Sequence, residues 1–143
     1  MSIVRMTRAH LSDVAELEKI CFSEPWSESA LELLLGDAAI GSVCEQDGRA
    51  VAYVGMLLAC DEGQITNVAV HPNARRQGIG RRLMEAIAHD AQERGFVQIA
   101  LEVRVSNDAA VQLYEKDGFV IAGRRLRFYR DPTEDAFVMV KAL

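Results

Sequence analysis

The chain has 143 residues, half of them hydrophobic, and its 21 acidic and 16 basic residues give a formal net charge of −5. This length suits one domain with its own core, and the acidic balance argues against non-specific binding to nucleic acid, which needs a basic field. No apolar run approaches the roughly 20 residues that span a bilayer, and the N-terminus has no signal-peptide pattern. We therefore expect a single-domain cytoplasmic protein that binds neither a membrane nor nucleic acid.

The first half of the chain predicts a strand, two helices and a hairpin. Thr7 and Ser27 have side chains that cap helix N-termini, and Gly36 is suited to end the second helix. Asp47-Gly48 is a strong signal for a two-residue hairpin turn. In chain order we expect a strand at 3–6, helices at about 7–22 and 27–35, and strands at about 41–45 and 50–59.

The second half alternates strands with helices before a closing pair of strands. The strand–helix–strand unit at 64–103 needs a crossover, which favours parallel, right-handed pairing. The full order is βααβββαβαββ, which predicts a mixed α/β sheet with helices on both faces. The expected elements are a strand at 64–70, a helix from 79 to about 94, a strand at 98–103, a helix at 109–116, and strands at 119–128 and 136–141.

A turn rich in glycine and arginine, Arg75-Arg76-Gln77-Gly78-Ile79-Gly80, lies between the strand at 64–70 and the long helix. Glycine has no Cβ, so its backbone can approach a ligand closely, and a helix N-terminus offers free N–H groups to an anion. The turn lacks the Lys-Ser/Thr pair of a P-loop and the three-glycine Rossmann spacing. It predicts a phosphate-binding cradle of another type; the alternative is an ordinary helix start whose glycines serve the turn.

The spacing Arg-x-x-Gly-x-Gly after Val70-His71-Pro72 resembles the acetyl-CoA pyrophosphate loop of the GCN5-related N-acetyltransferases (GNAT). Within this superfamily the chain is similar to the RimI group, the ribosomal protein S18 alanine N-acetyltransferases. The resemblance covers nearly the whole chain, and the element order matches as well. It is carried by Glu24-Pro25-Trp26-Ser27-Glu28, by residues 66–72, by Leu101-Glu102-Val103-Arg104 with Ser106-Asn107, and by Arg124-Arg125 followed by Tyr129 and Glu134-Asp135-Ala136.

The resemblance implies a GNAT fold over residues 1–143, acetyl-CoA as the donor, no metal, and the N-terminal alanine of ribosomal protein S18 as the acceptor. The acetyl group would pass directly to the amine in a ternary complex. Such a transfer needs a group that removes a proton from the amine and one that protonates the leaving thiolate. Glu102 matches the family's general base and Tyr114 its general acid. The alternatives are a strand-end glutamate paired with an arginine, and a core tyrosine with a hydrogen-bonded hydroxyl.

The resemblance also assigns residues to the donor. The backbone of Val68, Ala69 and Val70 would bind the pantetheine amides where this strand bulges and parts from the next one. Asn107 can cap the following helix, contact the pantetheine arm, or do both. The residues expected around the pyrophosphate are Arg75, Arg76, Gln77, Gly78, Ile79, Gly80 and Arg81.

Three residues, Trp26, Tyr129 and Glu134, are expected to bind the acceptor peptide. Trp26 can instead pack in the core, and Glu134 can cap its loop rather than face a basic ribosomal peptide. Phe128-Tyr129 departs from the two adjacent tyrosines usual in the family, which bears on the peptide that is preferred.

The three cysteines, Cys21, Cys44 and Cys60, are an odd number without CxxC spacing. We expect free thiols that are buried or half-buried, not a disulfide or zinc site. The three histidines are scattered, so no metal cluster is predicted.

Two rival functions remain open from the sequence. One is an acetyltransferase for a lysine, a polyamine or a drug, and the other is a non-catalytic module that binds acyl-CoA. The cradle fits both, and only Glu102 and Tyr114 argue against the second. The sequence predicts no oligomeric state.

Overall fold

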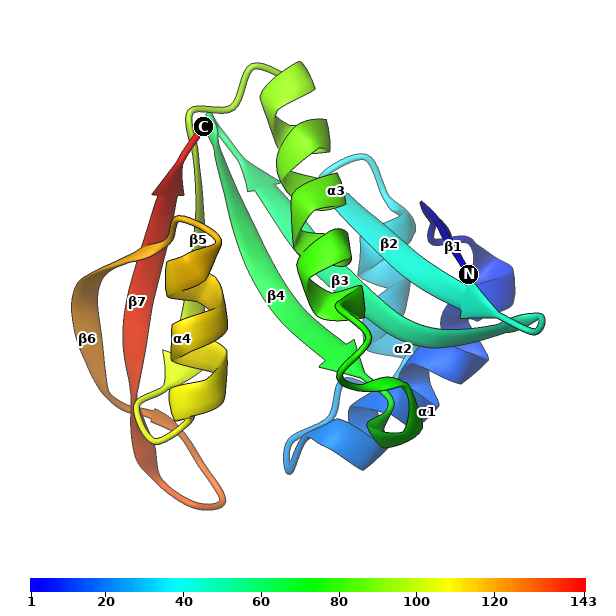
Figure 1. Cartoon of the computed structure of the whole chain (residues 1–143), viewed down its shortest axis with the longest axis horizontal. Coiled ribbons are helices and arrows are strands. Elements are labelled where there is room, and N and C mark those ends of the chain that lie inside the picture. Colours follow the sequence, from blue (N-terminus) through cyan, green and yellow to red (C-terminus); the bar gives the residue numbers. More distant parts are fainter.

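The chain folds around one mixed sheet of seven strands with helices on both faces (Figure 1). The strands lie in the order β1-β2-β3-β4-β5-β7-β6, and only β4 and β5 pair in parallel. The computed structural model describes residues 1–143. Its elements are β1 (Ser2–Arg5), α1 (Leu11–Cys21), α2 (Glu28–Leu31), β2 (Ala39–Gln46), β3 (Arg49–Ala59), β4 (Glu62–Val70), α3 (Ile79–Glu93), β5 (Gln98–Arg104), α4 (Asp108–Lys116), β6 (Val120–Tyr129) and β7 (Glu134–Ala142).

The strand bounds differ from the predicted ones by at most two residues, but the first helix begins differently. Thr7 does not cap α1, because a 3-10 turn at Arg8–His10 comes first. The N–H of Thr7 donates to Nδ1 of His10 over 2.9 Å, which closes this turn. The histidine at the third position of the turn, whose ring reaches back to Thr7, was not recognised as a start signal.

The second predicted helix is also partly 3-10. The cap is confirmed, because Oγ of Ser27 accepts a 3.0 Å hydrogen bond from the N–H of Ala30. The α-helical part ends at Leu31, and Glu32–Leu35 continue as a 3-10 helix that ends at Gly36. In the hairpin, Asp47 and Gly48 have φ values of 52° and 78°. Both positive values fit the primed turn that Asp-Gly predicts.

Two hydrophobic cores hold the helices against the sheet. On one face, α3 and α4 cover a core that includes Leu83, Ile87 and Leu101. On the other face, α1 and α2 pack with Leu11, Val14 and other buried residues of a second core. Figure 1 shows α3 and α4 in front of the sheet and α1 and α2 behind it. None of the helices has the length and apolar character that a membrane span needs.

The parallel strands β4 and β5 pair over only a short stretch. The paired positions are Glu62–Gln64 with Gln98–Ala100, and beyond them the two strands part (Figure 1). The register of β4 against β3 shifts between the pairs Val54–Val68 and Met56–Ile65, which places a bulge at residues 66–67. A bulge bends its strand and increases the local twist. The bulge and the parting of β4 from β5 open the sheet at the C-terminal ends of these strands.

Candidate active site

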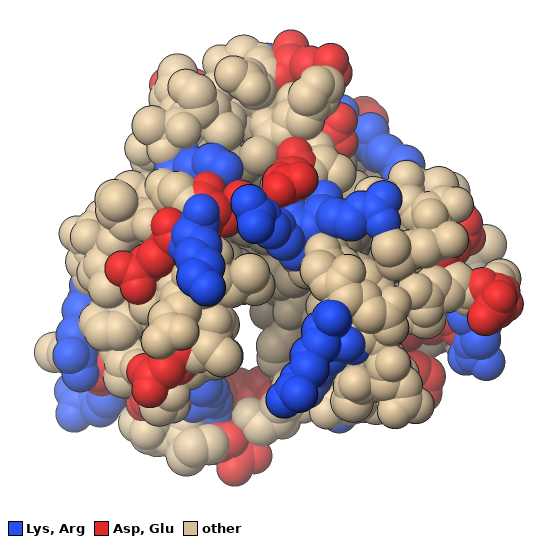
Figure 2. Space-filling view, viewed as in Figure 1, with Lys and Arg blue, Asp and Glu red and all other residues tan.

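A cleft of about 530 Å³ occupies the space between the separated ends of β4 and β5. Figure 2 shows the molecule hollowed there, with basic side chains around the hollow on the face that carries α3 and α4. Five parts of the chain line the cleft: residues 21–24 and Trp26 at the end of α1 and just after it, residues 65–68 of β4, residues 101–104 of β5, the residues Asn107, Ala110 and Tyr114 at α4, and Phe128 and Tyr129 of β6.

The glycine–arginine turn leads from β4 into α3, as the sequence predicts. Gly78 is the N-cap of α3 with φ of 73°, a conformation that favours glycine. Gly80 lies in the first turn of the helix, and a Cβ added there would come no closer than 3.7 Å to another part of the protein, at Val70. Because glycine weakens a helix by roughly 0.5–1 kcal/mol relative to alanine, and nothing in the protein fills its space, Gly80 leaves room for a ligand.

The polar side chains of this turn are exposed, and all but that of Arg76 have partners within the protein. Arg75 donates from Nε to the carbonyl of Val70 over 3.1 Å. Gln77 accepts from Gln46 over 3.2 Å, and Arg81 pairs with Glu85 over 3.2 Å. No partner is found for the side chain of Arg76, whose φ is 65°. Pyrophosphate binding by this turn stays a prediction, since Arg75, Gln77 and Arg81 make contacts within the protein.

The strand before the turn offers backbone groups toward the cleft. Because β4 pairs with β5 only as far as Gln64, residues 65–70 have no ladder partner on the β5 side. Val68 and Ala69 remain paired with β3 on the other side. The carbonyl of Val70 is bonded to Arg75. A ligand lying in the cleft can use the other backbone groups of this stretch that lack a partner on the β5 side, and binding of the pantetheine by Val68, Ala69 and Val70 stays a prediction.

Glu102 lies on β5 at the cleft with about a fifth of its side chain exposed. Its Oε1 is 3.4 Å from Nε of Arg125, an arginine of β6 whose own side chain is mostly exposed. The ion pair matches the alternative interpretation of this residue, a strand-end glutamate paired with an arginine. The structure thus places Glu102 at the cleft and gives it an arginine partner as well.

Tyr114 comes from α4 and lines the same cleft. Its ring packs against Phe119 with the ring centres 5.8 Å apart. Burial raises the pKa of its phenol to about 12. No hydrogen bond to the protein is found for its hydroxyl, so the structure does not show the alternative, a core tyrosine with a bonded hydroxyl. Asn107 caps α4 by accepting a 3.2 Å hydrogen bond from Ala110.

The residues expected at the acceptor side lie on opposite walls. Trp26 is half-buried after α1 and lines the cleft. Across from it, the guanidinium of Arg104 lies 4.4 Å from the ring centre of Tyr129. Burial, followed by the charge of Glu102, raises the pKa of Tyr129 to about 12.

Glu134 has internal partners for both carboxylate oxygens. One oxygen is 3.2 Å from Arg104, and the other accepts from the backbone of Ser106 over 2.8 Å. Hydrogen bonds from Ser106, and then the Arg104 guanidinium, hold its pKa below the usual range. This geometry supports the alternative in which Glu134 organises its loop, and peptide binding by Glu134 stays a prediction.

The sequence analysis missed Glu18, a fully buried carboxylate on α1. Its oxygens accept from the N–H of Trp26 over 2.8 Å, the hydroxyl of Tyr53 over 2.6 Å, and the amide of Asn67 over 3.1 and 3.0 Å. Burial raises its pKa. The available signal was its position on the apolar face between Val14 and Cys21, where a charged residue is rarely buried without partners.

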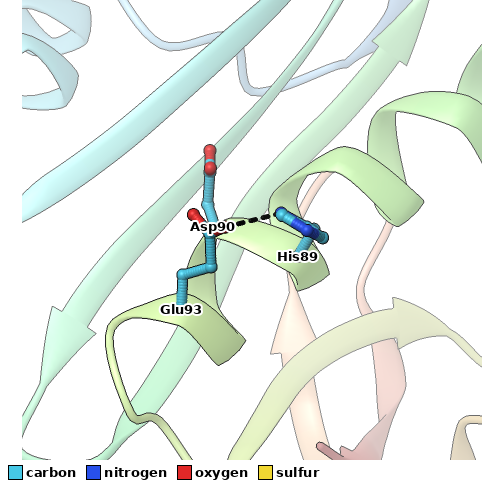
Figure 3. A group of neighbouring side chains, drawn as sticks. All are labelled: His89, Asp90 and Glu93. Carbon is cyan, nitrogen blue, oxygen red and sulfur yellow. Dashed lines mark ion pairs between the residues drawn. The ribbon is translucent and has the colours of Figure 1, made fainter.

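Two expectations about cysteine and histidine need correction. Cys60 is exposed, because it lies in the turn after β3 with φ of 54°. His89 is not isolated: its ligand atom lies within 4.8 Å of those of Asp90 and Glu93 on the same helix (Figure 3). The contact to Glu93 is 3.7 Å and exposed. Exposed groups of this kind are common without an ion, and these side chains lie outside the cleft.

Known proteins share both the sequence and the shape of this chain. The acetyltransferase (GNAT) family matches residues 11–119. The ribosomal protein bS18-alanine N-acetyltransferase of Escherichia coli strain K12 is 36% identical over 125 residues, which cover 86% of this chain and 84% of that protein. The crystal structure of the ribosomal-protein-S18-alanine N-acetyltransferase from Escherichia coli covers 99% of this chain and 92% of its own, with a TM-score of 0.91 and 33% identity. The NatC complex bound to Gag peptide and CoA contains a chain with a TM-score of 0.83 and 26% identity, covering 100% of this chain and 99% of its own.

Proposed function

The chain belongs to the GNAT acetyltransferase family, and on that premise we propose that it transfers an acetyl group from acetyl-CoA to the N-terminal amine of a protein. The acceptor we propose is the N-terminal alanine of ribosomal protein S18, the substrate named for the Escherichia coli relative. Residues 1–143 would form one N-acetyltransferase domain. The observation that carries the proposal is that Glu102 and Tyr114 both line the cleft between β4 and β5.

The donor would lie along β4 and end at the cradle. The unpaired backbone of residues 65–70 would bind the pantetheine amides. The first turn of α3 would direct its free N–H groups and the positive end of its dipole at the pyrophosphate. The space at Gly80 admits this close approach, and the exposed arginines of the turn and of α3 would bind the phosphate charges. The NatC complex, which contains a chain similar to this one, was solved with CoA, and this supports CoA as the ligand.

The acceptor amine must lose a proton before its lone pair can attack the thioester carbon. Glu102 would take this proton, directly or through one water, from a position that already borders the cleft. An α-amine has an ordinary pKa near 8, against roughly 10 for a lysine. A carboxylate that is only partly buried is therefore better matched to an α-amine than to a lysine.

The sulfur of CoA must gain a proton as it leaves. Tyr114 would supply it, because its hydroxyl has no partner in the protein and its pKa of about 12 keeps the phenol protonated. Starting from the ammonium form, the nitrogen loses two protons in all. The first goes to Glu102 and on to solvent before the attack. The second is lost as the N–C bond forms, and it balances the proton that the sulfur gains as the S–C bond breaks. No covalent acetyl-enzyme is needed, so both substrates would be bound together.

The test is acetyl transfer from acetyl-CoA to three acceptors, with CoA release as the readout. The acceptors are an alanine-starting S18-type peptide, the same peptide with a blocked N-terminus, and spermidine. Turnover that vanishes on blocking supports the proposal. Equal turnover on the blocked peptide would instead mean lysine acetylation, and turnover only on spermidine would mean a polyamine acetyltransferase.

A non-catalytic CoA-binding module would bind CoA and release none from acetyl-CoA with any acceptor. The Tyr114→Phe variant then provides a matched control. Under either view it should retain CoA affinity, but it can slow turnover only if the chain is an enzyme.

A further inference from the structure

The carboxylate of Glu18 is the most deeply buried charge of the chain, and no cation pairs with it. Its partners are all neutral donors: the backbone N–H of Trp26, the hydroxyl of Tyr53, and the side-chain amide of Asn67. Trp26 and Asn67 both line the cleft, whereas Glu18 is not among its lining residues. Burying a charge costs free energy unless the charge is hydrogen-bonded. We therefore expect the hydrogen bonds from Trp26, Tyr53 and Asn67 to keep fixed positions around the carboxylate.

The charge of Glu18 determines how the amide of Asn67 is turned. An ionised carboxylate can only accept hydrogen bonds, and only the Nδ2 end of an asparagine amide can donate them. Both oxygens of Glu18 lie within 3.1 Å of Nδ2 of Asn67. The carbonyl oxygen Oδ1 is left at the other end of the amide. It accepts no hydrogen bond from the protein and is not among the buried unpaired atoms, so it keeps accessible surface.

We propose that Oδ1 of Asn67 accepts a hydrogen bond from the acceptor amine, and that Glu18 is the positioning residue that keeps this oxygen turned toward the cleft. The inference rests on the proposed function and extends it to the recognition of the amine. An ammonium group carries three N–H donors, and the amine that remains after proton loss carries two. With Asn67 on β4 and Glu102 on β5, the nitrogen is bonded from both walls, and its lone pair is left to face the thioester.

The Glu18→Gln variant tests the positioning role. A glutamine presents an NH₂ group where the carboxylate oxygens were, and that group needs an acceptor. One of the two oxygens that face Nδ2 of Asn67 is thereby replaced by a donor, which disfavours the wild-type orientation of this amide. Turning the amide over relieves the conflict, but it puts the NH₂ of Asn67 toward the cleft, where it opposes an ammonium. We expect the KM for the peptide to rise on the order of tenfold to a hundredfold, as for a lost hydrogen bond to a charged group, while the KM for acetyl-CoA stays within about twofold.

Two further variants make the result specific. Asn67→Ala removes the oxygen itself and should raise the KM for the peptide by a similar factor. Asp13→Asn neutralises another carboxylate of α1, which bonds to Arg49 and to the N–H of Ala50 away from the cleft. The Asp13→Asn variant should leave both KM values unchanged, which separates the local effect from a general change in charge.

A direct binding measurement completes the test. In the presence of CoA, the wild-type protein should bind the alanine peptide more tightly than a des-amino analogue that has hydrogen in place of the amine. Glu18→Gln and Asn67→Ala should show a smaller preference for the amine-bearing peptide, because only Glu102 is left to bond its nitrogen. If Glu18 and Asn67 were only structural, the variants would bind both peptides and acetyl-CoA more weakly. They would also unfold at a lower temperature than the wild type.

The proposal is overturned if folded Glu18→Gln and Asn67→Ala proteins keep the wild-type KM for the peptide and the preference for the amine. It is also overturned if these variants bind both peptides and acetyl-CoA more weakly by the same factor. A wild-type protein that acetylates no α-amine would refute the proposed function before any variant is compared.

Discussion

Oε1 of Glu24 accepts a 2.9 Å hydrogen bond from the backbone N–H of Arg130, joining two residues that are 106 positions apart in the chain. Glu24 lies in the loop after α1, and Arg130 directly follows β6. The bond therefore connects the two walls of the cleft on the side where we place the acceptor. Arg104 holds the same loop by donating to the carbonyl of Arg130 over 3.0 Å.

Removing this hydrogen bond should lower the selectivity of the protein for an α-amine over a lysine. An exposed hydrogen bond is worth about 1 kcal/mol, so for Glu24→Ala we expect the ratio of lysine to α-amine acetylation to rise by a factor of about 5. The measurement compares the blocked and free peptides. Glu28→Ala, an exposed glutamate of α2, is the matched control. An unchanged ratio would show that the contact does not limit access.

Gly80→Ala should separate ligand binding from folding. The added Cβ meets only Val70, at an ordinary 3.7 Å, so the free energy of unfolding should stay the same or rise by about 0.5–1 kcal/mol. The methyl group would occupy space that we assign to the pyrophosphate, so CoA affinity should fall by at least about tenfold, as for one lost charge-assisted contact. Gly123→Ala, which meets nothing within 4 Å, is the control. Calorimetry with CoA that shows unchanged affinity in Gly80→Ala would contradict the cradle.

Tyr114→Phe should slow turnover by about a hundredfold or more if the phenol is the general acid. The ring still packs on Phe119, so stability and CoA affinity should change little. Steady-state turnover and CoA titration on the same preparation check both statements. Wild-type turnover in this variant would remove Tyr114 from the mechanism.

The pKa of Tyr114 sets the highest pH at which turnover should remain unaffected by loss of its proton. The protonated phenol is the active form, and its pKa of about 12 lies above the ordinary value for tyrosine. Deprotonation of Tyr114 should therefore not reduce turnover below roughly pH 11. A profile of turnover against pH for wild type, with unfolding monitored in parallel, tests this. A decline centred near pH 10 that is absent in Tyr114→Phe would contradict it.

Glu134 should stabilise the fold in a pH-dependent way. Its pKa is lowered in the folded protein, so its contribution is present above its unfolded pKa and is lost as the pH falls through its folded pKa. Glu134→Gln should thus be less stable than wild type at pH 7, and the two should converge below about pH 4. Urea unfolding at both pH values measures the difference. If the difference in the free energy of unfolding persists at low pH, it arises from packing and not from the charge of Glu134.

Most of the architecture follows from local signals in the sequence. Asp47-Gly48, the cap at Ser27 and the alternation of the strands predict elements that depend on near neighbours. The expected GNAT fold is confirmed by the match to the Escherichia coli structure. The 3-10 turns were missed because they depend on contacts such as that of Thr7 with His10, which resemble an ordinary helix start.

The long-range polar contacts were harder to predict. The face that carries Leu11 and Val14 indicates that Glu18 is buried, but its donors come from residues up to 49 positions away. The turn sequence indicates an anion site, yet it does not show that Arg75 bonds back to Val70. The cation beside Glu102 comes from β6, and only the pairing of β5 and β6 with β7 brings it there.

The short pairing of β4 with β5 has a mechanical consequence. The two strands are joined only at their N-terminal ends, where Glu62 accepts hydrogen bonds from Gln64 and from Gln98 across the strands. The sheet therefore consists of two parts, β1–β4 and β5–β7, that are hydrogen-bonded to each other only over this short stretch. A molecule bound between these two parts would supply the backbone hydrogen-bond partners that β4 and β5 lack there. It would thus complete the sheet in the way that a strand does, and its release as product would leave the two strand ends unpaired again.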